Sequence, residues 1–516
     1  MSLLQGAIAA NRFGLGARPG EILAASSDPR GWLKAQIRPD AALIPADGLM
    51  TVEQVFTERR EAYANMSPDD LAKLGGKRKA AADPSMQTSD GSRPEPGGQN
   101  PALANIPQEV RKEIQKEARQ GLQQEIAARS RHAAATPDPF AERWVRFWSN
   151  HFTVAARNPQ LIGIVGPFER DVIRAHAFGS FAGLLGASTF HPTMLVYLDA
   201  NRSIGPSTQV AERRKLGLNE NLAREVLELH TMGVDTGYTQ ADVIEFAKAL
   251  TGWTVGGQAR PGGGQNQQKL ARLAGRRRGG GQGGGLIQVA LDLQDHPGET
   301  VFVEPFHEPG SRKILGKTYS VQGKQQAAAV LDDLARSPAT AHHIATKLAR
   351  HFVADDPPPA AVAKLQAVFL ETHGDLSALA RTVVDLDEAW VEAPAKFKTP
   401  EELLVSVSRA AGAQAAFGRD QRAVYVSLAQ QPFGAPSPAG WPDIASAWSG
   451  ADAVMKRLEW ANAVSQRMSA MGSPEDFLDR ALGPMAGEKT RQGVSRAESA
   501  EQGFTLALMS PEFQRR

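Results

Sequence analysis

Three histidines stand in helical surroundings, and two lie in the segments 139–152 and 188–203. His151 ends an apolar helical stripe that includes Trp144 and Trp148, so its ring faces the apolar side of that helix. His191 precedes Pro192 where a helix is expected to start, and it either takes part in chemistry or caps that helix. A histidine in apolar surroundings serves as a catalytic base or as a metal or haem ligand, unless it is a core residue bonded to backbone or carboxylate.

The third histidine shares a predicted helix with two glutamates. At 100° per residue, His230 lies about 40° from the apolar centre at Val226, which predicts that it is buried. Glu225 and Glu228 lie about 140° and 160° from His230, so this helix alone does not offer a glutamate and His230 to one metal ion. Paired carboxylates are solvated, bound to arginine, or functional as metal ligands or as an acid and a base.

These residues define the first functional hypothesis, an enzyme with a His/Glu site between helices and an unspecified reaction. The candidate catalytic residues are His151, His191, Glu225, Glu228 and His230. Glu225, Glu228 and His230 are also the candidate ligands of a divalent metal ion, if neighbouring helices complete the site. Another hypothesis is a haem protein that uses His151 and His230 as axial or distal groups.

Two further segments are given structural roles. The stretch from His342 to His351 carries three histidines, a lysine and an arginine, and is expected to lie mostly on the surface because adjacent histidines point in different directions on a helix. The proline-rich segment from Gln430 to Asp443 cannot form a helix or a central strand. We expect it to wrap the helical body in an extended form, anchored by Phe433 and Trp441.

Helix start signals supply the elements that must position these residues. They combine a capping side chain with a following proline or a capping box, at Asp138-Pro139, Thr239 to Asp242, Ser337-Pro338, Thr399 to Glu402 and Ser473-Pro474. The segment 108–130 is rich in charged residues and predicts a largely exposed helix. Strand-like segments occur at 300–306 and 313–319, and we expect them to pair as a hairpin around 307–310.

The predicted fold is mostly α, a single multi-helix globular bundle over 1–516 with one small β-hairpin. Two Gly- and Pro-rich stretches, 75–108 and 256–285, interrupt the helical periodicity and are expected to be disordered insertions. The second contains GRRRGGGQGGG, but without interleaved aromatic residues we expect a solvated loop and no nucleic-acid binding.

The bulk composition excludes several classes of function. Fifty-eight basic and 56 acidic residues give a net charge of +2, so no global field attracts nucleic acid or an anionic membrane. The absence of cysteine excludes thiolate metal sites and a cysteine nucleophile. No run of about eighteen apolar residues and no export signal occur, so we expect no membrane span and a cytoplasmic location.

Eight blocks in order resemble a known bacterial family. They are NRFGLGARP, ERWVRFWSNHFTV, HPTMLVYLDANRSIG, GLNENLAREVLELHTMGVDTGYTQADV, ALTGWT, HIATKLARHFVADDPP, KFKTPEELLVSVSRA and PSPAGWPD. Together they resemble the family called domain of unknown function 1800, from about Asn11 to the final LMSPEFQ. The resemblance implies a helical protein and transfers no catalytic residue.

Members of that family are often encoded beside an exported phosphatase-like protein. This implies the alternative to an enzyme, a helical binding or maturation partner of that neighbour. In such a partner the histidines are core residues, the wrapping loops form the interface, and a large apolar patch is exposed. Co-export to the periplasm on the neighbour's signal is then compatible with a chain that has no signal of its own.

Overall fold

The structure is a computed structural model that describes residues 2–64, 108–214, 217–234, 236–257, 293, 295–470 and 472–516. Apart from residues 108, 256 and 257, both predicted insertions lie outside the described residues. Helices dominate the described chain, as the sequence predicts.

The N-terminal and central segments supply the helices that surround α7. The first group is α1 Leu3–Ile8, the π-helix η1 Ala9–Phe13, α2 Glu21–Ala25, α3 Pro29–Lys34, the 3₁₀ helix η2 Pro39–Ala42 and α4 Val52–Ala64. The second is α6 Gln108–Ala135, α7 Pro139–His151, α8 Pro159–Ile162, α9 Val165–Phe168, the π-helix η3 Glu169–Arg174, α10 Phe181–Thr189, α11 Pro192–Tyr197, the 3₁₀ helix η4 Ala200–Arg202, α12 Gln209–Arg214, α13 Asn221–Glu225, the π-helix η5 Val226–His230 and α14 Gln240–Leu250.

The C-terminal half adds further α-helices and short 3₁₀ turns. The α-helices are α17 Lys324–Ala335, α18 Pro338–Phe352, α19 Pro359–Glu371, α20 Leu376–Val384, α21 Pro400–Ala411, α22 Ala413–Phe417, α23 Gln421–Ser427, α24 Ala451–Met468, α25 Pro474–Ala481, α26 Glu488–Ser495, α27 Ala500–Met509 and α28 Pro511–Gln514. The 3₁₀ turns are η6 Glu304–Phe306, η7 Asp387–Ala389, η8 Ala445–Ala447 and η9 Gly483–Met485.

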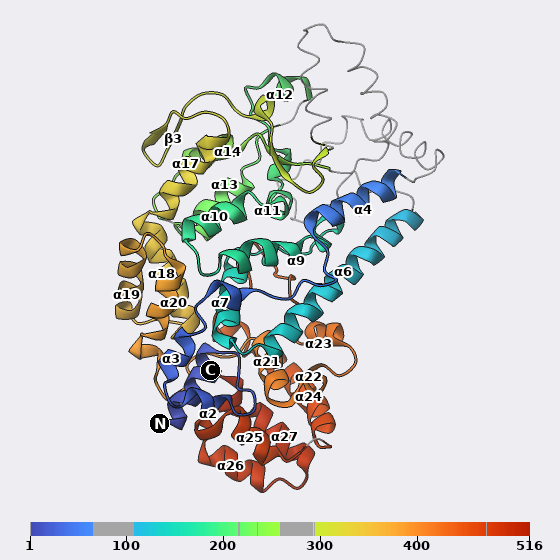
Figure 1. The fold of residues 1–516 in the computed structure, drawn as a ribbon, viewed down its shortest axis with the longest axis vertical. Coiled ribbons are helices and arrows are strands. Elements are labelled where there is room, and N and C mark those ends of the chain that lie inside the picture. The colour runs from blue at the N-terminus through green and yellow to red at the C-terminus, as the bar shows by residue number, and fades with distance from the viewer. Residues whose placement is uncertain are drawn as a thin grey trace.

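The apolar core is centred on α7, which lies in the middle of the molecule with α18, α19 and α20 on one side and the long α6 on the other (Figure 1). One cluster of buried apolar residues extends from Ala7 to Phe513. Within it Trp144 stacks on Phe178 with ring centroids 6.4 Å apart, and Trp148 meets Trp144 edge to face. The aromatic stripe predicted from the sequence therefore packs into the core, and the charged sides of α7 are buried as well.

Four of the five predicted helix starts carry the expected cap. Ser337 and Ser473 cap α18 and α25, and both Thr239 and Thr399 form complete capping boxes, for α14 and α21. Asp138 is the exception, because its carboxylate accepts from both Nη atoms of Arg38, at 2.9 and 2.8 Å, and makes no side-chain bond to the start of α7.

The predicted pairing of the two strand segments is wrong. The strands β1 Trp253–Val255 and β2 Thr300–Phe302 form one antiparallel pair, and β3 Arg312–Ile314 and β4 Lys317–Tyr319 form another. A tight turn joins β3 to β4, so these two strands pair with each other. The earlier strand β2 pairs instead with β1, which directly follows α14.

The segment 125–130 of α6 is largely buried, although the sequence predicts a largely exposed helix. Arg129 donates to Glu169 with Nε 2.8 Å from Oε2, and Glu125 pairs with Arg170. Both α6 residues are less than 9% exposed. Charged side chains enter the interior here because each has an opposite charge to meet it, which composition alone does not reveal. No helix in the described ranges is long and apolar enough to span a bilayer.

Candidate active site

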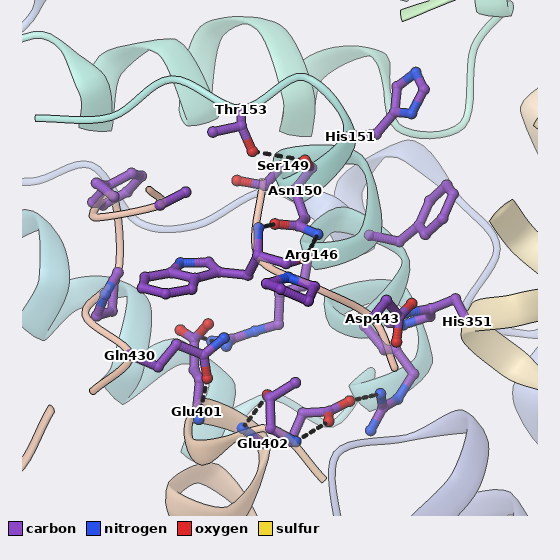
Figure 2. Close-up of a pocket in the computed structure, with 18 of the residues that line it drawn as sticks. Arg146, Ser149, Asn150, His151, Thr153, His351, Glu401, Glu402, Gln430 and Asp443 are labelled. Carbon is purple, nitrogen blue, oxygen red and sulfur yellow. Dashed lines mark hydrogen bonds and ion pairs between the residues drawn. The ribbon is translucent and has the colours of Figure 1, made fainter. Parts of the chain in front are cut away.

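A cavity of about 350 Å³ lies between α7, α18, α21 and the segment 430–444. This is within the size range of small-molecule sites in proteins. Aromatic residues line it, namely Phe147, Phe168, Phe433 and Trp441. Charged and titratable side chains also line it, namely Arg129, Arg143, Arg146, His151, Glu169, Lys347, Arg350, His351, Glu401, Glu402 and Asp443. Figure 2 shows the polar part of this lining.

A histidine and an aspartate form a close pair in the wall of the cavity (Figure 2). Nδ1 of His351 lies 2.7 Å from Oδ2 of Asp443, whereas the buried Nε2 has no hydrogen-bond partner among the described residues. Burial alone would raise the pKa of Asp443, but the interaction with His351 and the charge of Lys396 hold it well below its ordinary value. The ionised Asp443 accepts a hydrogen bond, so neutral His351 carries its proton on Nδ1 and a lone pair on Nε2.

The segment that contains Asp443 is fastened to α7 by one amide side chain. Asn150 accepts from the backbone N–H of Trp441 at 2.7 Å and donates to the Trp441 carbonyl oxygen at 2.9 Å. At the far end of this segment, Lys396 donates to the backbone oxygen of Asp443 at 2.7 Å. The wrapping segment predicted from its prolines therefore forms a wall of the cavity, and Phe433 and Trp441 are both half-buried in it.

The carboxylate of Glu402, at the start of α21, is held by two buried ion pairs and a capping box. Glu402 closes the capping box with Thr399, pairs with Arg143, and lies 2.8 Å from Nε of Arg516. Burial opposes ionisation, yet Arg516 and Arg143 keep the pKa of Glu402 far below its ordinary value. This glutamate is therefore a fixed negative charge rather than an acid that titrates near neutrality.

Arg146 brings a positive charge from α7 to the cavity. Its Nε donates to Oε1 of Glu142 at 3.0 Å, and Nη1 pairs with Oε1 of Glu401 at 2.8 Å. Arg146 is 9% exposed, and its buried Nη2 has no hydrogen-bond partner within the described ranges. An unsatisfied guanidinium nitrogen is costly when buried, which marks this atom as a potential ligand contact.

The cationic face of α18 lines the cavity, which corrects the prediction that the segment 342–351 lies mostly on the surface. His342 is exposed, as that prediction has it, but Lys347 and His351 are only partly exposed and line the cavity together with Arg350. Burial lowers the pKa of Lys347 to about 8, against the opposing effect of Asp443. The sequence shows these residues at helical offsets of three and four, but it does not show which segment covers them.

Beside the cavity, three histidine rings gather in the core, two of them predicted site residues. The ring centroids of His230 and His343 each lie 6.2 Å from that of His151. Nε2 of His151 bonds to the His230 backbone oxygen at 3.1 Å, and neither ring nitrogen of His230 has a partner in the described chain. Burial lowers the pKa of His230 to about 3 and that of His343 to about 4, so these rings are neutral near pH 7.

The backbone of η5 explains how His230 reaches this cluster. The chain leaves α-helical geometry at Val226, where the π-helix begins, and the π-helix ends at His230, three residues before Gly233, which has a φ of +94°. The expected 100° per residue therefore does not hold between Glu225 and His230. Single π-helical turns inside helices occur frequently at functional sites.

The other predicted site residues lie elsewhere. His191 caps α11, because its Nδ1 accepts from the backbone N–H of Thr193 at 3.2 Å. Glu225 and Glu228 are half-buried, and Arg224 pairs with Glu228 at 3.4 Å. Burial first, and then the charge of Glu228, raise the pKa of Glu225 to about 7.

Among the five predicted residues, the structure thus joins His151 and His230, and only His151 lines the cavity. Its ring points away from the other labelled cavity residues (Figure 2). In the ranges that the structure describes, no group of three or more His, Asp or Glu side chains has the arrangement of a metal site. Glu225, Glu228 and His230 are therefore not gathered into one ligand set.

A comparison with known proteins now places the chain. The family described as "Protein of unknown function (DUF1800)" matches residues 8–515. The chain belongs to this family. The match covers nearly the whole chain and confirms the resemblance carried by the eight sequence blocks. No curated protein and no solved structure matches the chain.

Sequence reasoning missed His351, Asp443, Lys347 and Arg350 as site residues. The signals were present, because HIATKLARHF and PSPAGWPD are two of the eight family blocks and each carries a side of the His351–Asp443 pair. The two residues are 92 positions apart, and no periodicity in the sequence relates them. Only the packing of the segment 430–444 against α18 brings them together.

Proposed function

We propose that the protein is an enzyme that works by general acid–base catalysis, with the cavity between α7, α18 and α21 as its active site and His351 as the base. The observation that carries this proposal is the unpartnered Nε2 of His351, on a ring held by Asp443 at 2.7 Å. A histidine oriented through one nitrogen by a buried carboxylate, with its other nitrogen unpaired, is the arrangement of a general base.

The simplest reaction that this base supports is hydrolysis of an ester. Nε2 of His351 takes a proton from water while the water oxygen bonds to the ester's electrophilic atom. The bond to the leaving group then breaks, and the imidazolium returns the proton to the departing oxygen. Asp443 stays ionised throughout and stabilises the transient imidazolium.

The proposal is tested with the purified full chain and chromogenic nitrophenyl esters of a neutral acid, of a dicarboxylic acid and of phosphoric acid. We expect turnover of at least one ester, and a fall of about 10²–10⁴-fold in His351→Asn. His342→Asn is the matched control, since that histidine is exposed on the same helix. Absence of turnover by the wild type, or equal turnover by a folded His351→Asn variant, would contradict the proposal.

The other functions expected from the sequence remain predictions. A binding or maturation role beside an exported phosphatase-like protein, with co-export, is not favoured by any contact described above. The haem hypothesis requires a ring nitrogen of His151 to face an iron. Nε2 of this residue is engaged with the His230 backbone, which leaves Nδ1 as the ring nitrogen with no partner among the described residues. A divalent-metal enzyme built on Glu225, Glu228 and His230 requires these side chains to move together.

A further inference from the structure

The cavity holds two cations that its carboxylates do not neutralise. Arg143 pairs with Glu402, and Arg146 with Glu401, while Arg129 takes Glu169. The remaining carboxylate of the lining, that of Asp443, is bound by His351 and Lys396.

Lys347 and Arg350 are the two cations of the lining that form no ion pair with a described carboxylate. Nζ of Lys347 makes no hydrogen bond or ion pair with any described residue, and Arg350 uses only Nε, which donates to the Asp355 carbonyl oxygen at 3.1 Å. Both residues are half-buried in the cavity wall. Asp443 offsets the burial of Lys347 only in part, because its oxygens bond to His351 and Lys396. A partly desolvated cation without an ion-pair partner is costly, and a bound anion lowers that cost.

We propose that Lys347 and Arg350 bind an oxyanion group of the substrate, a carboxylate, a phosphate or a sulfate, next to His351, with Nη2 of Arg146 as a further donor. That the anion belongs to a substrate rests on the proposed function, whereas the anion site itself does not depend on that function. On α18 the offsets of three and four place Lys347, Arg350 and His351 on one face of the helix. An anion held there therefore lies beside the proposed base.

Two further features agree with an anion in this place. Burial lowers the pKa of Lys347 to about 8, as expected for an amine that lacks a partner. Nη2 of Arg146 is a buried donor with no partner in the described part of the chain. The aromatic lining formed by Phe147 and Trp441 leaves the rest of the ligand in apolar surroundings, so the substrate combines an oxyanion with an apolar or planar body.

The test is calorimetric titration of the full chain with inorganic sulfate at constant ionic strength, below pH 8 so that Lys347 is charged. We expect saturable binding to the wild type, weakened about tenfold or more in Lys347→Met and in Arg350→Met. Lys364→Met on α19 is the matched control, because this exposed lysine does not line the cavity. Parallel titrations with phosphate and succinate distinguish a tetrahedral anion from a carboxylate as the preferred group.

The outcomes separate this inference from the proposed function. His351→Asn should retain sulfate binding while it loses turnover, so an inert wild type that still binds sulfate through Lys347 contradicts the enzyme but not the anion site. The anion site is overturned if none of the three anions binds, or if binding is unchanged in both Lys347→Met and Arg350→Met.

Discussion

At the scale of single residues, the interior of this protein contains charges whose partners decide their chemistry. Asp443 and Glu402 are held ionised by cations around them, whereas the amine of Lys398 has no hydrogen-bond partner among the described residues and Glu402 offsets only part of its burial. Lys398 is 1% exposed, and its Nζ lies 4.4 Å above the ring of Phe513. Burial lowers the pKa of this amine to about 7.

Replacing Lys398 by methionine should stabilise the protein. The folded pKa of about 7 lies below the unfolded value of about 10.4, so between them only the unfolded chain binds this proton. Wild-type stability therefore rises with pH across this window and is lowest at and below neutrality. We expect Lys398→Met to raise the free energy of unfolding near pH 7 by on the order of 2 kcal/mol, a gain that shrinks toward pH 10.

Urea unfolding at several pH values measures this gain. Lys364→Met, which changes an exposed lysine, should leave the free energy of unfolding unchanged within about 0.5 kcal/mol. A Lys398→Met variant that is less stable than the wild type at neutral pH would show that the charged amine contributes to stability.

At the scale of elements, helix starts follow from the sequence because a cap depends on residues three apart. Thr399 and Glu402, like Thr239 and Asp242, form the expected capping boxes. Strand pairing does not follow, since each strand has three residues and β1 pairs with β2 across a long separation. The π-helix η5 carries no signal in its residues, so the predicted directions of Glu225 and Glu228 relative to His230 rested on the wrong helical geometry.

The caps of α21 and α14 allow a matched comparison. Thr399→Ala and Thr239→Ala should each lower the free energy of unfolding by about 1 kcal/mol, because each removes the same kind of cap. Thr399 lines the cavity and its box holds Glu402, so Thr399→Ala should also reduce turnover, whereas Thr239→Ala should not. Denaturant unfolding and the ester assay measure the two effects. Equal turnover in the two variants would show that the cap of α21 does not affect the active site.

At the scale of the whole molecule, a near-zero net charge conceals a network of buried ion pairs around α7. Glu142 is fully buried and pairs with Arg174 at 2.7 Å and with Arg146 at 3.0 Å, and Arg174 also binds Glu169 at 2.8 Å. Composition and periodicity predicted the helical class and the apolar face of α7. They could not predict this network, because its partners come from separate elements and each charge is buried only because the other is present.

Removing one charge from this network should destabilise the fold as a whole. Glu142→Gln removes the carboxylate that Arg174 and Arg146 share and leaves each arginine with one remaining partner, Glu169 and Glu401, so we expect a loss of about 3–5 kcal/mol near pH 7. Burial alone would raise the pKa of Glu142, but Arg174 and Arg146 hold it far below the ordinary value. Its contribution is therefore present above about pH 4.5 and is lost as the pH falls below that value.

Urea unfolding of both proteins at neutral and acidic pH checks this expectation. The difference between the wild type and Glu142→Gln should shrink as the pH falls below about 4.5, because the wild type alone then loses this contribution. A difference that stays constant with pH would mean that the loss arises from packing and not from charge.

The pH dependence of kcat/KM is the most direct test of His351 as the base of an active site. The base must be unprotonated, so the wild-type value should fall on the acid side as His351 takes up a proton at a pKa that burial lowers below its ordinary value. Asp443→Asn, which no longer enforces the Nδ1 proton, should retain a folded protein and lose about 10²–10⁴ in kcat. If His351 is the base, His351→Asn abolishes the acid limb; an acid limb that persists unchanged in a folded His351→Asn variant would show that another group is the base.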